Sequence, residues 1–308
     1  MIQNSSIKII LRFADWFFII RPTMLFTYWT MVLGGLGLHG DFDDISLITV
    51  ICISFGMGAA NLLNLVNDIE ADRLNQKLPW IYHGLITPKR VVIYLIILYI
   101  FGLGGLAVQG GMMTFLTSVV LFGGLGLLYN IGPSPLKRKP LLSLLMSALI
   151  GGGLWIVGAV AVGGILEITM MSLARYTSAW TAVCLISMIP DIKGDRETGK
   201  ITFAVKFGAK LTTRFSLVLI LISLAYSIFP MDLVLLAPAV ISFPFFLTAS
   251  FSGNIKWITL AAKSSVLTLS IMVAIYYVWQ YFILIAIYFF LARWYYRTRF
   301  NLIYPSLK

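Results

Sequence analysis

The sequence predicts an all-α integral membrane protein with nine transmembrane helices, and three observations lead to this prediction. Of the 308 residues, 59% are hydrophobic and only 11% are charged, whereas a soluble domain carries about 25% charged residues. Apolar runs of about 20 residues, each long enough to span a bilayer, recur along the whole chain. Between these runs, basic loops alternate with loops that contain no lysine or arginine. A chain with these properties lies mostly within lipid and crosses it many times.

The apolar runs follow one another with no linker or separate soluble domain between them. They lie at 17–38, 45–66, 91–108, 112–130, 141–163, 170–189, 213–230, 232–250 and 265–291. We therefore expect residues 1–308 to form a single membrane domain, in which the long last run is tilted or broken. No cleavable signal peptide is evident, because the first run has full span length. Cys52 and Cys184 fall inside predicted spans and read as small buried hydrophobic residues.

The distribution of charge predicts the orientation in the membrane. The net charge of +11 comes mainly from the N-terminus and from four loops, within 73–90, 137–139, 193–214 and 256–263. The positive-inside rule places these segments in the cytoplasm, so the charge does not indicate a nucleic-acid partner. Nine crossings would put the basic residues after 291 on the opposite side, unless the last run does not cross exactly one time.

Two sets of carboxylates lie at the ends of apolar runs. Asn64, Asp68 and Asp72 are spaced i, i+4, i+8, which places them on one face of a helix, and Asp191 and Asp195 have the same spacing. Carboxylates near membrane depth are costly and usually functional. They could merely cap helices and pair with neighbouring arginines. Two sets at matching positions on the same side instead favour oxygen-ligated Mg²⁺, which shares its coordination with substrate phosphates.

Cations lie close to both sets in the sequence. Arg73, Lys77 and Arg196 are near the carboxylates, and Lys137 lies in a loop on the same side. Together with Mg²⁺ they would stabilise the charge that grows on a departing diphosphate. Tyr129 enters the same loop, and its aromatic face could shield a carbocation.

The chain also repeats its organisation weakly. The first carboxylate set ends the second run and the second set ends the sixth, and each is followed by a basic stretch and a short amphipathic piece, at 83–91 and 199–208. This predicts two four-helix pseudo-repeats around one cavity, with a ninth helix added. Glycines are frequent in the runs, which is typical of closely packed membrane helices.

Taken together, these motifs resemble the UbiA superfamily of intramembrane prenyltransferases over nearly the whole chain. Asn64-xxx-Asp68-xxx-Asp72 is similar to the first motif of the family, and Asp191-xxx-Asp195-Arg196 to the second. The Arg21–Pro22 entry and the segment from Tyr129 to Lys137 also resemble the family pattern. The sequence departs from it at Leu78–Pro79, where the family often has Arg-Pro, and at Asn130, where Ser is usual.

The resemblance implies nine helices around a central cavity that opens sideways to lipid. It implies Mg²⁺-dependent transfer of a prenyl group from a diphosphate to a lipophilic acceptor, through ionisation of the C1–O bond. The carboxylates would have catalytic and metal-binding roles, and the nearby cations would hold the diphosphate. The implied metal ligands are Asn64, Asp68 and Asp72 for one Mg²⁺ and Asp191 and Asp195 for the other; the implied diphosphate ligands are Arg73, Lys77, Lys137 and Arg196.

The acceptor stays open at this point. An aromatic quinone precursor is the commonest in the superfamily and is our first expectation. A carotenoid, a chlorophyllide or a glycerol-phosphate ether lipid is an alternative, as is an intramembrane terpene cyclase that uses no acceptor. A transporter of a phosphorylated lipid is a third class, which would bind the diphosphate without cleaving it. The expected partners are these substrates and the bilayer, and no protein partner is evident.

Overall fold

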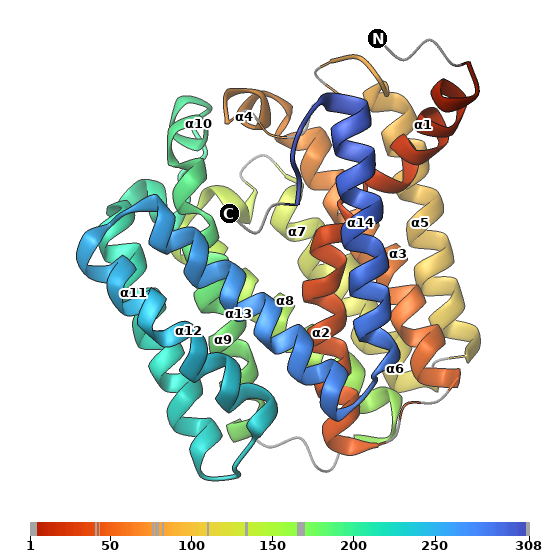
Figure 1. Ribbon diagram of the computed structural model, residues 1–308. Coiled ribbons are helices and arrows are strands. Elements are labelled where there is room, and N and C mark those ends of the chain that lie inside the picture. The colour runs from red at the N-terminus through yellow and green to blue at the C-terminus, as the bar shows by residue number, and fades with distance from the viewer. Residues whose placement is uncertain are drawn as a thin grey trace.

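The structure, a computed structural model, describes residues 5–40, 42, 44–75, 77, 80–81, 83–109, 111–132, 135–164 and 170–305. Leu78 and Pro79 lie outside the described residues. The long helices run side by side between two ends of a bundle, and shorter helices cover one of these ends (Figure 1). The helices are α1 (Ser5–Phe18), α2 (Pro22–His39), α3 (Asp44–Asn67), α4 (Ile69–Leu74), α5 (Pro88–Gln109), α6 (Gly111–Ser118), the π-helix η1 (Val119–Gly126), α7 (Leu127–Asn130), the 3₁₀ turn η2 (Leu136–Arg138), α8 (Pro140–Ala161), α9 (Met170–Ser187), the 3₁₀ turn η4 (Ile189–Asp191), α10 (Ile192–Glu197), α11 (Phe203–Ile228), α12 (Leu233–Ser252), α13 (Ile255–Tyr276) and α14 (Gln280–Phe300).

The predicted all-helical membrane fold is confirmed, but the count of nine spans is not. Among the described residues, seven helices are long and apolar enough to cross a membrane. The predicted run at 265–291 is divided between α13 and α14, with a break at 277–279. The first run begins only at Pro22, which occupies the first turn of α2, where its missing N–H costs nothing.

Helix α14 is separate from α13, so the chain crosses back to the end of the bundle from which α13 started. It returns the backbone to the end of the bundle that carries α4 and α10 (Figure 1). The basic residues Arg297 and Arg299 in its last turn are thus at the same end as the two carboxylate motifs. This removes the conflict between the basic tail and the alternation of basic loops.

Helix pairing reflects the predicted pseudo-repeat. Helix α3 packs against α5 in the first half, as α9 packs against α11 in the second, and α2 contacts α3 as α8 contacts α9. The two halves meet where α2 crosses α8. Both motif-bearing helices, α3 and α9, therefore have equivalent neighbours.

The crossing of α2 and α8 depends on glycine. A Cβ atom on Gly35 would collide with the carbonyl oxygen of Trp155, and one on Gly158 would collide with the carbonyl oxygen of Val32. Only a residue without a side chain lets two helix backbones approach this closely. The expectation that glycines serve helix packing is confirmed at these positions.

Helices α1 and α14 are joined by a buried polar contact. Asp15 of α1 is 2% exposed and accepts hydrogen bonds from the Tyr295 hydroxyl at 2.6 Å and from the Arg299 guanidinium at 3.0 and 2.8 Å. Trp80 donates its indole N–H to the same tyrosine hydroxyl at 2.9 Å. The Phe18 and Tyr295 rings stack with centroids 3.9 Å apart. This contact fixes the position of the last helix against the first.

Candidate active site

The two carboxylate motifs meet at one end of the bundle, where α4 and α10 contact each other (Figure 1). Each short helix continues the chain beyond a long one, α4 after α3 and α10 after α9 and η4. Both begin the same pattern, Asp-Arg with a Lys four residues after the arginine, at 72–77 and 195–200. The backbone N–H of Lys77 donates to the Asp72 carbonyl at 2.9 Å, and that of Lys200 donates to the Asp195 carbonyl at 2.8 Å. Each lysine is therefore folded back over the end of its own helix.

Each of the two lysines contacts an aspartate of the other motif. The Lys77 ammonium lies 2.8 Å from Asp191 of the second motif, and the Lys200 ammonium lies 2.9 Å from Asp68 of the first. Each also lies 3.4 Å from the aspartate of its own pattern, Asp72 or Asp195. We call these four contacts the lysine cross-brace. It joins the two halves of the molecule at the carboxylates.

Asn75 adds a neutral link between the motifs. Its side-chain oxygen accepts a hydrogen bond from the Gly194 backbone N–H at 2.9 Å. Its side-chain nitrogen donates to the Asp191 carbonyl oxygen at 3.3 Å. A Cβ on Gly194 would meet the Asn75 amide, so glycine is needed there for α4 and α10 to approach.

Further cations contact the first motif from other elements. Lys137, in η2 and 1% exposed, lies 2.6 Å from Asp68 and donates to Asn64 at 3.1 Å. Its third partner is the side-chain oxygen of Asn130, at 3.3 Å. Arg21, just before α2, contacts Asp72 at 2.6 Å. The first motif is thus held by four segments of the chain.

These contacts shift the acidities of the carboxylates in opposite directions. Burial raises the pKa of Asp68, but Lys200 and Lys137 outweigh it and hold that pKa below its usual range. Burial also raises the pKa of Asp195, and there the pKa remains above its usual range. Burial lowers the pKa of Lys137, whereas Asp68 and Asp195 overcome burial and raise the pKa of Lys200.

A cavity of about 260 Å³ with a partly polar lining, called the polar cavity below, opens beside the cross-brace. Asn64, Asp191, Asp195, Lys77 and Tyr129 are among its lining residues. The chain reaches Tyr129 through the π-helix η1, whose wider turn rotates the residues that follow it.

Arg73 and Arg196, the two other predicted diphosphate ligands, are not brought into this cavity. Arg73 is exposed and pairs with Glu70 one turn earlier in the chain, and Arg196 is exposed on α10. Neither is among the described residues that line the cavity. Their contact with a diphosphate stays a prediction.

The donor set suits a hard divalent cation. Among the described residues, no three His, Cys, Asp or Glu side chains lie close enough together to enclose a metal ion, because lysine ammonium groups lie between the carboxylates. The available ligands are carboxylate and amide oxygens, which Mg²⁺ prefers, and Mg²⁺ completes its coordination with waters and phosphates. Asn64, Asp68, Asp72, Asp191 and Asp195 fit that role.

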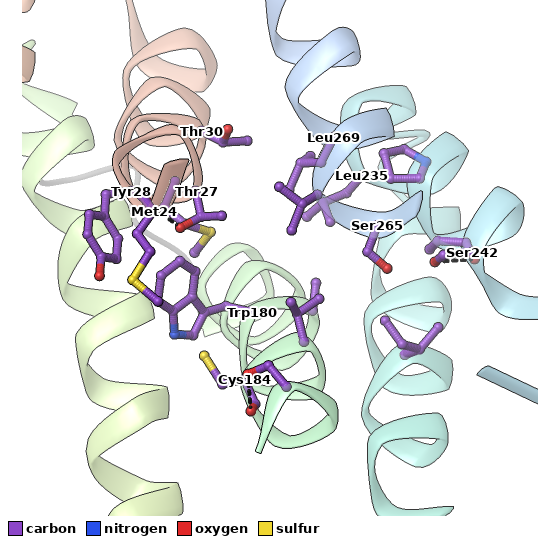
Figure 2. A pocket seen from close by; sticks show the side chains of 18 of the residues that line it. Met24, Thr27, Tyr28, Thr30, Trp180, Cys184, Leu235, Ser242, Ser265 and Leu269 are labelled. Carbon is purple, nitrogen blue, oxygen red and sulfur yellow. Dashed lines mark hydrogen bonds between the residues drawn. The ribbon is translucent and has the colours of Figure 1, made fainter. Parts of the chain in front are cut away.

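A second, largely apolar cavity of about 300 Å³ adjoins the first. Met24 and Tyr28 of α2 and Trp180 and Cys184 of α9 line both cavities. Figure 2 shows Trp180 directed toward Met24 and Tyr28, with Leu235 and Leu269 across the space. Helices α2, α9, α11, α12 and α13 surround this space, which is suited to an apolar chain.

Trp180 forms the partition between the two cavities and is held from three sides. Its indole N–H donates to the Ser147 carbonyl at 2.9 Å, and its ring occupies the space where a Gly151 side chain would be. The Tyr28 ring lies with its centroid 5.9 Å away, and its hydroxyl donates to Asn61 at 2.8 Å. The boundary between polar and apolar space is therefore well defined.

Sequence reasoning did not assign four residues of this site. They are Arg21, Asn75, Asn130 and Lys200. A signal for Lys200 was present, because Gly199 has φ 70°, a conformation that favours glycine and ends helices, and the residue after such a stop folds back over the helix. No local signal identifies Arg21 or Asn75, whose partners lie 51 and 116 residues away.

Comparisons with known sequences give a consistent result. A sequence model of the UbiA prenyltransferase family matches residues 23–265. Digeranylgeranylglyceryl phosphate synthase from Methanococcus aeolicus is 29% identical over 189 residues, which cover 58% of this chain and 62% of the relative. The enzyme of the same name from Methanospirillum hungatei is 28% identical over 163 residues, covering 52% and 56%. This chain thus spans less than two thirds of the length of these relatives.

Comparisons with solved structures support the fold. A UbiA homologue from Archaeoglobus fulgidus bound to GPP and Mg²⁺ superimposes with a TM-score of 0.67 at 16% identity, covering 85% of this chain and 99% of the other. A homologue from Aeropyrum pernix K1 gives a TM-score of 0.67 at 16% identity, covering 83% and 96%. At these identities the similarity shows a common fold.

Proposed function

Because this chain belongs to the UbiA prenyltransferase family, we propose that it transfers a prenyl group from a prenyl diphosphate to a lipophilic acceptor in an Mg²⁺-dependent reaction. The observation that carries the proposal is the lysine cross-brace beside a polar cavity that adjoins an apolar one. Cations and carboxylates from both halves meet at one end of the polar cavity, and the apolar space continues past Trp180. A molecule with a charged head and a long hydrocarbon chain matches both parts.

The proposed donor binds with its diphosphate among Lys77, Lys137 and Lys200 and its chain in the apolar cavity. Mg²⁺, when bound to the motif oxygens, neutralises charge on the diphosphate. The lysines release their carboxylates and donate hydrogen bonds to the phosphate oxygens, so the charge that develops on the leaving group is stabilised. Neither half alone carries this arrangement.

Bond cleavage would take place next to Tyr129. The C1–O bond of the donor breaks, its electron pair leaves with the diphosphate, and the allylic cation lies within reach of the Tyr129 ring, whose π face stabilises positive charge. A nucleophilic atom of the acceptor then bonds to C1, and its proton passes to the released diphosphate. The apolar walls exclude water, which would otherwise capture the cation.

The proposed acceptor is a prenylated glycerol phosphate. The relatives from M. aeolicus and M. hungatei are both named digeranylgeranylglyceryl phosphate synthase, which favours this acceptor over the aromatic quinone precursor that we expected first. The positive charge near the cavity suits an acceptor that also carries a phosphate. Arg21 lines the polar cavity and would exchange its contact with Asp72 for the acceptor phosphate.

The proposed orientation places the site toward the cytoplasm. The motif end of the bundle carries the basic loops and the last turn of α14, with Arg297 and Arg299. The positive-inside rule assigns such an end to the cytoplasmic face. Water-soluble diphosphate would be released on that side.

The test is a reconstitution in liposomes with Mg²⁺ and geranylgeranyl diphosphate. Geranylgeranylglyceryl phosphate and an aromatic acceptor such as homogentisate are supplied in separate reactions, and products are identified by mass spectrometry. We expect a diether phosphate from the first reaction, and loss of product on addition of EDTA or in an Asp191→Ala variant. Arg138→Ala, which changes an exposed residue, serves as the control.

The alternatives give different products. A hydrocarbon formed from the diphosphate without any acceptor would identify a cyclase, and intact diphosphate moved across the liposome membrane would identify a transporter. A prenylated aromatic product would support the proposed transferase activity but would contradict the proposed acceptor.

A further inference from the structure

Three lining residues of the apolar cavity lie beyond the family match, Val266 and Leu269 in α13 and Tyr304 after α14. The match ends at residue 265 within α13, whereas Tyr304 follows α14 and lines the cavity. Its ring is 36% exposed, which is the position of a residue at the rim of the cavity rather than at its base. The element that brings it there is therefore additional to the matched fold.

The path from α14 to the cavity is fixed by backbone contacts. Asn301 ends α14 in the left-handed conformation, at φ 55°, and the Leu302 N–H then donates to the Tyr296 carbonyl at 3.1 Å. This helix stop reverses the chain direction. The Tyr296 and Tyr304 rings meet edge to face with centroids 4.9 Å apart, so the turn places the Tyr304 ring against the end of α14.

Tyr304 also forms a hydrogen bond to α2. Its hydroxyl lies 2.9 Å from the Thr23 hydroxyl in the first turn of α2. Thr23 lines the apolar cavity together with Met24 and Thr27. Two residues earlier, Arg21 contacts Asp72 of the carboxylate site. The segment that follows α14 is thus hydrogen-bonded to α2, close to the Arg21 contact with the carboxylate site.

The same C-terminal end of α14 is anchored a second time. The buried contact of Asp15 with Tyr295 and Arg299 holds the helix to α1, and Tyr295 and Tyr296 have no exposed surface. A ring carried on so rigid a support keeps a constant position at the cavity rim. The Tyr304 ring therefore limits the size of the molecules that can enter the apolar cavity.

We propose that Tyr304 is a specificity-determining residue that narrows the mouth of the apolar cavity beside Thr23 and selects lipid substrates by bulk. This rests on the proposed function for the identity of the substrates, but the narrowing itself is a property of the free protein. The Tyr304 ring fills space, and the hydroxyl bond to Thr23 orients it. Loss of the ring widens the mouth, whereas loss of the hydroxyl alone leaves the ring in place.

A cysteine introduced by Ser265→Cys provides a reporter that needs no catalysis. Ser265 lines the apolar cavity and is not among the residues that line the polar one, and the two native cysteines, Cys52 and Cys184, are changed to alanine. In this background, the labelling rate at position 265 by small N-ethylmaleimide is compared with that by bulky N-pyrenylmaleimide. We expect Tyr304→Ala to raise the pyrenyl rate severalfold with little change in the N-ethylmaleimide rate, and Tyr304→Phe to remain close to the parent.

Tyr276→Ala is the matched control, since it removes another half-exposed tyrosine ring, at the end of α13. An unchanged ratio of the two rates in Tyr304→Ala would overturn the proposal, as would an equal rise in Tyr276→Ala or in Tyr304→Phe. In the transferase assay, Tyr304→Ala is expected to increase kcat/KM for acceptors with two hydrocarbon chains relative to those with one. If the parent protein transfers no prenyl group to any acceptor, the proposed function fails, while the labelling ratio still decides whether Tyr304 narrows the mouth.

Discussion

The two carboxylate motifs share one chain pattern but are held to different degrees. Asp68 and Asp72 of the first motif are 6% and 3% exposed, and each contacts two cations, which come from different segments. In the second motif, the Asp191 side chain is 22% exposed and contacts Lys77, and Asp195 contacts Lys200. The cross-brace is therefore nearly symmetric, while Lys137 and Arg21 are added on one side. The first motif is organised by the protein itself, whereas in the second Asp195 is 3% exposed and Asp191 alone retains more freedom to adapt to ligands.

The largest expected effect comes from Asp68→Asn, which tests the more constrained motif. The change removes the charge that Lys137 and Lys200 share, so transfer should fall by about 10³-fold, as when a preorganised electrostatic group is lost. The rate is measured in liposomes, with thermal unfolding as a check on folding. Glu70→Gln, on the exposed side of the same segment, should retain activity. A loss no larger than that of Asp191→Asn would remove the distinction between the motifs.

The contributions of the two cross-brace lysines to transfer can be separated by changing each lysine alone. Lys200 is 15% exposed and Lys77 is 33% exposed, so Lys200→Met should reduce transfer by about 10²-fold and Lys77→Met by about 10-fold, because buried charges interact more strongly with substrate than exposed ones. Steady-state rates at saturating donor provide the comparison. Equal losses would show that the two lysines are equivalent despite their different burial.

Asn75→Ala tests the neutral link, which has no counterpart in the second motif. Two hydrogen bonds, to Gly194 and Asp191, are lost, so the free energy of unfolding should fall by about 2 kcal/mol. Thermal denaturation in detergent measures this change. The variant Asn67→Ala, whose amide makes a single bond to Asn130, is the control and should change less. An unaltered stability in Asn75→Ala would show that the lysines alone join the motifs.

The smallest effect is expected at the arginine that both patterns contain. Arg73 and Arg196 are exposed at corresponding positions, so Arg73→Ala and Arg196→Ala should each leave the KM for the donor within about twofold, in line with other exposed charges. A tenfold rise in KM for either variant would instead support the diphosphate contact predicted from the sequence.

The sequence predicted those parts of the molecule that depend on local patterns. Hydrophobic runs identified the helices, and the four-residue spacing identified both carboxylate sets. It predicted that the long run at 265–291 is tilted or broken but did not locate the break at 277–279, because this lies in the aromatic and apolar sequence Tyr-Val-Trp, which carries no turn residue. The contacts of Arg21 and Asn75 were also beyond reach, since they depend on how distant segments pack.

The glycine contact between α2 and α8 has a mechanical consequence. With backbone touching backbone at Gly35 and Gly158, the two helices have no compressible side chains between them and cannot be pressed closer or slide freely past one another. The crossing therefore holds α2 and α8 at a fixed separation. The apolar cavity is also bordered by α11, α12 and α13, and we expect any widening of the cavity to displace these helices rather than to separate α2 from α8.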